Sequence, residues 1–235
     1  MGMRFKSLGA MVLVAAGLVA CAVQAPRPPP GREPGPAGFP EEFYQQSVQR
    51  GLPVFEIDPA ISLIVIEVRR GGSLAKLGHD HAIASHNVRG YVAPSQARAD
   101  LFVRLDELVI DEPELRTEAG FDSQPTAAAI AGTRENMLAQ LHADLHPYAV
   151  IAVDAVETVA DGPWLNASIA LNGVRRAVRV PVRIEQDPGQ LTLSGHVALE
   201  QSQFGIEPLA ILGGALVVQD RVEVRFVIHA QRAIS

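Results

Sequence analysis

Five stretches in the C-terminal half of the chain alternate apolar and polar residues with a period of two. They are 150–156, 165–171, 178–184, 191–199 and 222–230. In the last stretch the apolar members would share one face of an extended strand: Val222, Val224, Phe226 and Ile228. The pair Asn172-Gly173, between two of the stretches, is typical of a two-residue β-hairpin turn. Short strands joined by tight turns predict an antiparallel barrel or sandwich.

The preceding region has the same extended character, with one interruption. Its strand-like stretches are 61–68, 83–92, 99–105 and 108–111. Between them and the C-terminal half, Ile130, Met137, Leu138 and Leu141 recur at helical spacing, which predicts one or two helices over about 125–143. A shorter helix is expected over 41–51. The sequence therefore predicts an all-β fold with a small helical insertion, which would cover one end or the mouth of a barrel.

Composition is that of a globular protein, with 48% apolar and 20% charged residues. The net charge is −6, and no run of basic residues exceeds two. Because nucleic-acid affinity depends on clustered positive charge, we expect no nucleic acid among the partners.

The N-terminus carries a targeting signal. Arg4 and Lys6 precede an apolar stretch, Leu8–Ala20, which is too short to span a bilayer as a stable helix. The stretch ends in Leu-Val-Ala before Cys21, the only cysteine of the chain, as in the lipobox of bacterial lipoproteins. We expect 1–20 to be a lipoprotein signal peptide and Cys21 to be lipidated, with palmitate among its acyl groups. The alternative is an ordinary cleaved signal peptide with a coincidental cysteine.

A proline-rich segment follows the predicted anchor. Residues 21–41 hold seven prolines, a density that favours extended, solvated backbone. We interpret this segment as a tether that holds the folded domain, 42–235, away from a membrane. Ala22 after the cysteine resembles the pattern that directs lipoproteins to the outer membrane, so the domain is expected to face the periplasm.

The stretch Leu77-Gly78-His79-Asp80-His81 concentrates titratable side chains directly after a predicted strand. His142 and His146 are spaced i and i+4, which puts them on one helical face if the helix continues that far. If the two segments meet, His79, His81, His142 and His146 would form a site suited to zinc, copper or nickel. In the alternative interpretation, Asp80 caps a turn and the imidazoles hydrogen-bond to backbone at a barrel rim.

A hydrolytic site is the weakest of the alternatives. Ser62 or Ser85 could act as a nucleophile with His79 and Asp80, but the chain has no G-x-S-x-G motif. Adjacency of His and Asp in sequence does not make a catalytic triad. We therefore expect the protein not to be an enzyme.

Several short motifs, in order along the chain, are similar to those of the YceI family of periplasmic lipocalin-like proteins. They are Phe55-Glu56-Ile57-Asp58-Pro59 with Ser62, the stretch 137–151, Leu171-Asn172-Gly173-Val174, Gln203-Phe204-Gly205-Ile206, and the stretch 213–226. Two features depart from the usual pattern. The Gly-His-Asp-His segment is typical of a less studied branch of the family, and the usual Tyr-Pro order is inverted at Pro147-Tyr148.

The resemblance implies an antiparallel lipocalin-like barrel of about eight strands that holds a long-chain isoprenoid or another amphiphilic lipid. The alternating faces supply the residues expected to line its interior: Ile64, Ile66, Leu101, Val103, Ile151, Val153, Ile169, Val180, Val182, Leu193, Val197, Val224 and Phe226. Few aromatic residues and many Val, Ile and Ala favour a cavity. The alternative is a closed core filled by the same side chains.

The expected function is a lipid-anchored carrier or sequestering module for an apolar or amphiphilic small molecule. A homodimer is one assembly consistent with that role. His79 and His81 should lie at a barrel end near the helical insertion, within reach of His142 or His146, and touch the polar head of the ligand or a metal. The alternatives are a metal- or haem-associated module that uses His79 and His81, and a structural envelope protein with a filled barrel.

Overall fold

The structure is a computed structural model that describes residues 35–233. The predicted signal peptide, the lipidation site Cys21 and most of the predicted tether lie outside the described residues. The elements, in chain order, are α1 (Glu41–Gln49), β1 (Phe55–Ile57), β2 (Leu63–Gly71), η1 (Ala75–Leu77), β3 (His81–Ser85), β4 (Arg89–Ala93), η2 (Pro94–Gln96), β5 (Arg98–Arg104), η3 (Leu105–Glu107), β6 (Val109–Ile110), α2 (Pro113–Glu118), α3 (Ala127–Gln140), β7 (Tyr148–Val159), β8 (Gly162–Leu171), β9 (Val174–Gln186), β10 (Gln190–Glu200), η4 (Gln201–Phe204), β11 (Ala210–Ile211), η5 (Leu212–Gly214) and β12 (Leu216–Arg232).

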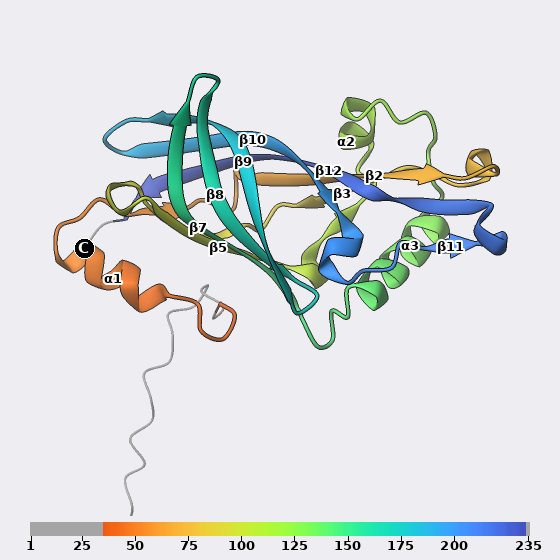
Figure 1. The fold of residues 1–235 in the computed structure, drawn as a ribbon, viewed down its shortest axis with the longest axis horizontal. Helices are drawn as coiled ribbons and strands as arrows, with labels where there is room; N and C mark the ends of the chain where they lie inside the picture. Colours follow the sequence, from red (N-terminus) through yellow and green to blue (C-terminus); the bar gives the residue numbers. More distant parts are fainter. Residues whose placement is uncertain (1–34, 234–235) are drawn as a thin grey trace, which may run out of the picture. The chain divides into compact units, whose positions relative to one another are not determined.

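Eight strands close into an antiparallel barrel in the order β1-β4-β5-β7-β8-β9-β10-β12, which returns to β1 (Figure 1). The predicted all-β fold with a small helical insertion is therefore confirmed. The four long strands β7 to β10 form a continuous meander, and each pairs with the next along the chain. The predicted Asn172-Gly173 turn joins β8 to β9, with both residues at positive φ (52° and 72°), as a type I′ hairpin requires.

The 17-residue strand β12 has partners along both edges. One edge pairs with β10 over Arg221–Gln231. The other edge pairs first with β2, from Val217 to Val227, and then with β1, from Ala230 to Arg232. Because β2 also pairs with β3, and β3 with β6, these three strands continue the sheet beyond the closed barrel.

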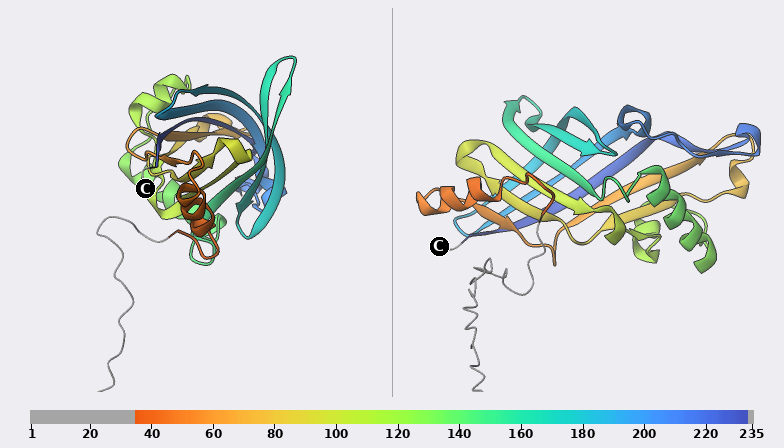
Figure 2. Two further views of the ribbon diagram at one scale, coloured as in Figure 1. Left: turned by 90° about the vertical axis from the view of Figure 1, so that its left-hand side faces the viewer. Right: turned by 90° about the horizontal axis from the view of Figure 1, so that it is seen from below.

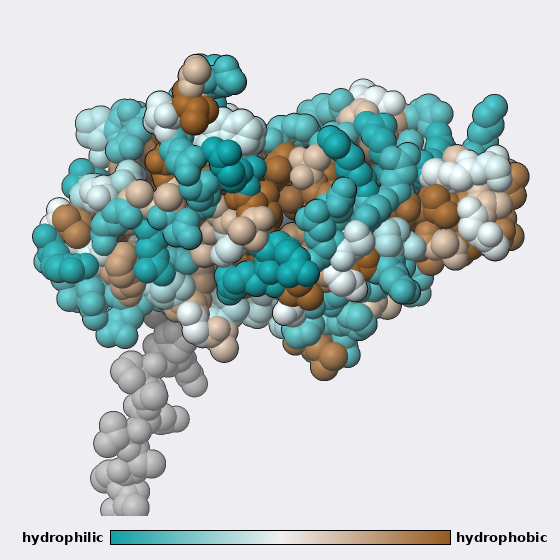
Figure 3. All heavy atoms as spheres, in the orientation of Figure 1, coloured by the Kyte–Doolittle hydropathy of each residue, from teal (hydrophilic) through white to brown (hydrophobic). Residues whose placement is uncertain are grey.

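The far end of this extension is a turn that requires glycine. Gly72 has φ +87°, and a Cβ at this position would lie 2.4 Å from the carbonyl oxygen of Ala215. Leu74 donates its N–H to the same oxygen at 2.7 Å. Apolar side chains gather at this end of the surface in Figure 3. The segments around η1 and η5 expose four large apolar side chains, those of Leu74, Leu77, Ile211 and Leu212.

The helices lie at different ends of the molecule, α1 at one end and α3 near the other (Figure 2). Helix α3 coincides with the predicted helical insertion, and its N-cap Thr126 accepts a hydrogen bond from the Ala129 N–H at 3.2 Å. Arg134 donates to the carbonyl of Leu108 at 2.7 Å, which attaches α3 beside β6. No helix of the described residues is long and apolar enough to cross a membrane.

One predicted strand was wrong, and one helix was not predicted. The stretch 83–92 is not one strand, because β3 ends at Ser85 and the chain turns through 86–88 before β4 begins. Helix α2 was not expected, because a helix of six residues is too short to show apolar periodicity. Its Pro113 occupies the first turn, a position where the missing N–H has no structural cost.

Candidate functional site: an apolar cavity with one histidine on a buried ion pair

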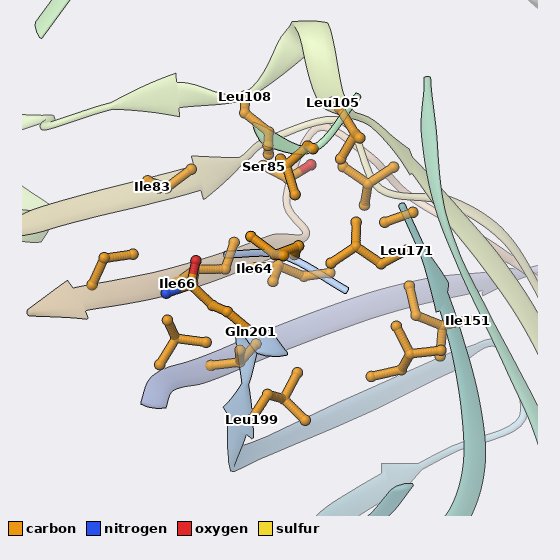
Figure 4. Close-up of a pocket in the computed structure, with 18 of the residues that line it drawn as sticks. Ile64, Ile66, Ile83, Ser85, Leu105, Leu108, Ile151, Leu171, Leu199 and Gln201 are labelled. Carbon is orange, nitrogen blue, oxygen red and sulfur yellow. The ribbon is translucent and has the colours of Figure 1, made fainter. Parts of the chain in front are cut away.

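A cavity with a volume of about 360 Å³ lies between strands of the barrel, strands β2 and β3, and helix α3. Figure 4 shows Ile64 and Ile66 of β2 on one side of this space, and Ile151 of β7 and Leu171 of β8 on the other. The volume lies within the range of small-molecule sites in proteins. An interior space of this size favours a binding cavity over the alternative of a filled barrel.

Most of the residues predicted to line the interior lie in the cavity wall. These are Ile64, Ile66, Leu101, Val103, Ile151, Val153, Ile169, Val180, Val197, Val224 and Phe226. Val182 and Leu193 do not line it. Both belong to the same apolar rows, but the cavity ends before them, and they pack in the core cluster instead. Period two predicts which face of a strand points inward, but it carries no information about depth along the barrel axis.

Helix α3 supplies lining residues that the strand pattern did not include. Thr133, Asn136, Met137 and Gln140 line the cavity, and their spacing puts them on one helical face. Gln201 of η4 adds a further amide. The insertion was predicted to cover one end or the mouth of the barrel, and it also contributes to the cavity wall; the polar residues of its inner face were not predicted.

Among the described residues, no Asp, Glu, Lys or Arg side chain lines the cavity. Its polar groups are neutral hydroxyls and amides, with the imidazole of His81 as the single titratable group. A ligand inside would therefore meet an almost wholly apolar surface with a few hydrogen-bonding positions.

His81 is held by a carboxylate outside the cavity. Its Nδ1 lies 2.7 Å from Oδ2 of Asp111, the residue that follows β6. Asp111 is buried, and its Oδ1 accepts the N–H of Ala82 at 3.0 Å and Nη1 of Arg116 at 2.5 Å. Burial by itself would raise the pKa of Asp111. The hydrogen bond with His81, the charge of the His81 ring when it is protonated, and the hydrogen bonds from Ala82 N–H and Arg116 outweigh it and hold the pKa of Asp111 below its ordinary value.

Arg116 of α2 is the centre of this polar network. Its side chain is 0% exposed, and it donates to Asp111, to the carbonyl oxygen of Asp80 and to the carbonyl oxygen of Ser123. The short helix α2 thus carries a buried cation that ties together the start of β3, the end of β6 and the loop after α2. Neither Asp111 nor Arg116 could be identified from the sequence, because their partners lie up to 36 positions away.

Of the two histidines in the Gly-His-Asp-His segment, His81 lines the cavity as predicted. Asp80 accepts the backbone N–H of Arg70 at 2.9 Å, so it bonds across to β2 rather than capping a local turn. His79 does not line the cavity, and its Nδ1 lies 3.2 Å from Oγ of Ser123. Both imidazoles therefore contact side chains instead of backbone.

The four histidines predicted to share a metal site are not brought together. His142 bonds to Asn172 at 2.7 Å, and His146 lies against Gly173, both at the β8–β9 turn. Helix α3 ends at Gln140, and His142 has φ 45°, so His142 and His146 do not share a helical face. Within residues 35–233, no group of three or more His, Cys, Asp or Glu side chains is placed to hold a metal ion.

The predicted serine nucleophiles are also engaged elsewhere. Ser62 exchanges hydrogen bonds with the backbone of His229, at 3.0 and 3.2 Å. Ser85 lines the cavity on the same strand face as His81, but four residues further along, which is roughly 13 Å in an extended strand. Asp80 contacts neither serine in the hydrogen bonds of the described residues, so the predicted arrangement of Ser, His79 and Asp80 does not form.

Comparison with known proteins supports the fold. No family model matches the chain, and no curated protein is similar to it in sequence. Among solved structures, a polyisoprenoid-binding domain from Saccharophagus degradans, implicated in plant cell wall breakdown, has 12% identity and a TM-score of 0.55. The match covers 76% of this chain and 98% of that domain.

Two further structures are similar. BcnA of Burkholderia cenocepacia has 16% identity and a TM-score of 0.50, over 74% of this chain and 99% of BcnA. The YceI protein of Campylobacter jejuni matches more weakly, with 13% identity, 60% and 77% of the two chains covered, and a TM-score of 0.40. At the level of fold, the resemblance predicted from the sequence motifs is confirmed. Assignment to the Gly-His-Asp-His branch stays a prediction.

Proposed function

We propose that this protein is a cell-envelope lipoprotein that binds an apolar or amphiphilic molecule, of isoprenoid or lipid type, inside its barrel. It would act as a carrier or sequestering module rather than as an enzyme. The observation that carries the proposal is the apolar cavity of about 360 Å³ between strands of the closed barrel, strands β2 and β3, and helix α3. The same fold occurs in a domain described as polyisoprenoid-binding.

The physical basis of binding would be hydrophobic transfer. Burial of apolar surface is worth roughly 25 cal/mol per Å², so a ligand that buries about 300 Å² gains roughly 7 kcal/mol before the costs of immobilisation. Affinity of this kind needs no charged contact. It agrees with a cavity wall in which only neutral groups and His81 interrupt the apolar surface.

Native mass spectrometry of the full chain, purified from its own host, tests the proposal. We expect a bound mass that disappears on organic extraction and that fragments as an isoprenoid or lipid. A clean ligand-free mass, under conditions that preserve lipid complexes of a control barrel protein, would contradict ligand carriage.

The anchoring is proposed from the sequence of residues 1–34. We infer cleavage after Ala20, lipidation of Cys21 and localisation to the outer membrane facing the periplasm. Mass analysis of the mature N-terminal peptide should find Cys21 carrying acyl chains. The variant Cys21→Ser should leave the protein unlipidated and released from the membrane fraction, whereas an unchanged fractionation would contradict the anchor.

A further inference from the structure

The ring of His81 stands between a buried carboxylate and the cavity. Asp111 does not line the cavity, whereas His81 does, and the two are joined through Nδ1 at 2.7 Å. The ring nitrogen left for a molecule inside the cavity is therefore Nε2. The hydrogen bonds of the described residues include none to this atom.

The contact with Asp111 also decides what Nε2 can do. A carboxylate at Nδ1 selects the tautomer with the proton on Nδ1, so the neutral imidazole presents a lone pair at Nε2. Arg116, at 2.5 Å from Asp111, supplies a counter-charge to this carboxylate when the imidazole is neutral. In this state Nε2 is the hydrogen-bond acceptor of a residue that lines the apolar cavity.

The part of the cavity wall that the structure describes offers no lysine or arginine to an anionic head group. Arg116 is fully buried and donates to Asp111, Asp80 and Ser123, while Arg70 donates to Asp122 at 2.9 Å and to the Gly78 carbonyl at 2.7 Å. A diphosphate inside would lose its hydration without a compensating charge.

We infer that the cavity selects a lipid alcohol, with the terminal hydroxyl donating its proton to Nε2 of His81 and the hydrocarbon chain lying among the apolar strand residues. The inference rests on the proposed ligand-binding function and makes it specific. Asp111 and Arg116 are positioning residues, since they fix the orientation and tautomer of His81 from outside the cavity.

Three probes that differ only in their head group distinguish recognition of a hydroxyl from binding through the hydrocarbon chain alone. They are a C15 prenol, its methyl ether and its diphosphate. The ether keeps the oxygen but cannot donate a hydrogen bond. Competition in native mass spectrometry of the full chain should show the prenol favoured over the ether by about fivefold to tenfold, the value of one net hydrogen bond. The diphosphate should bind more weakly than both.

The variant His81→Leu should bind prenol and ether equally, because it replaces the hydrogen-bond acceptor with an apolar side chain. His79→Leu is the matched control outside the cavity, and it should keep the wild-type preference. If His81→Leu does not fold, the ranking of the three probes by the wild-type protein still decides the question.

The outcomes distinguish failure of the lipid-alcohol inference from failure of the proposed ligand-binding function. Equal binding of prenol and ether to the wild type, or diphosphate binding as tight as prenol, would overturn the lipid-alcohol inference while leaving the cavity as a ligand site. Loss of preference in His79→Leu as well would also overturn it, since the effect would then not depend on Nε2. Failure of all three probes to bind would contradict the proposed function itself.

Discussion

Nδ1 of His81 lies 2.7 Å from Oδ2 of Asp111, and this contact links the first residue of β3 to the residue that follows β6. Two strands at the edge of the sheet are thereby held together beyond their own short ladder, which pairs only Ile83–Ile110 and Ala84–Val109. The lining position of His81 depends on this bond and, through Asp111, on Arg116.

Replacement of Arg116 by Met should destabilise the protein strongly. Arg116 is fully buried and pairs with Asp111 at 2.5 Å, so its removal leaves a buried carboxylate without its arginine partner. Loss of one partner of a buried pair costs about 3 to 5 kcal/mol. Urea unfolding measures the change, with the exposed pair Arg183–Glu185 as control. Arg183→Met should cost less than about 1 kcal/mol. Equal effects of the two substitutions would contradict the network.

Stability should depend on pH through Asp111. Its pKa in the folded protein is lowered, so the ionised form stabilises the fold. The contribution is complete above the ordinary aspartate pKa of about 3.9 and is lost as pH falls toward the folded pKa. We therefore expect the stability difference between wild type and Asp111→Asn to be largest near neutral pH and to shrink below about pH 4. A difference that stays constant into that acid range would argue against the assignment.

Filling the cavity should abolish ligand uptake without unfolding the barrel. Ala149 of β7 lines the cavity, whereas Ala152 of the same strand does not and points to the opposite face. The variant Ala149→Trp should lose the ligand mass in native spectra, and Ala152→Trp should keep it. Circular dichroism should show β-structure in both. Retained binding in Ala149→Trp would place the ligand elsewhere.

The attachment of helix α1 to the barrel should depend on the hydroxyl of Tyr44. The hydroxyl of Tyr44 donates to Asp100 at 2.7 Å, the ring stacks on Tyr91 at 5.0 Å, and the side chain is buried. Burial, and then the neighbouring Asp100, raise the pKa of Tyr44 well above its ordinary value. The variant Tyr44→Phe should cost about 1 to 2 kcal/mol in chemical denaturation.

Tyr148 provides the control for this effect. Its hydroxyl has no hydrogen-bond partner among the residues that the structure describes, and its ring packs on Phe102 at 5.7 Å. Tyr148→Phe should therefore leave stability within about 0.5 kcal/mol of wild type. If both substitutions cost the same, the bond to Asp100 is not what holds α1 in place.

Sequence patterns predicted the parts of this fold that are set locally. The meander from β7 to β10 followed from alternation and tight turns, and α3 from helical spacing, because strand faces, hairpins and helix faces depend on near neighbours. The inward orientation of Ile151, Val153 and Ile169 was predicted on the same basis. Whether a ligand occupies the space that they line stays a prediction.

The polar part of the site could not be predicted in this way. His81 was identified as a candidate, but its partner Asp111 lies 30 positions away and Arg116 sits on a helix too short to show a pattern. The metal interpretation required the segment of His79 and His81 to meet that of His142 and His146, but the fold places His81 against Asp111 and His142 against Asn172. Contacts across such separations are decided by the packing of the whole sheet, which no local period encodes.

The division of β12 between β10, β2 and β1 has a consequence for the order of events during biogenesis. The barrel closes through pairs such as Phe55 with Arg232, which join the earliest and the latest strands of the chain. Contacts of this sequence separation form slowly, and here they cannot form at all before β12 has been synthesised. Until then the inner faces of the strands have no enclosed space between them. A chain that stalls late would therefore expose these apolar faces to chaperones and proteases, and under the proposed function it could not yet take up a ligand.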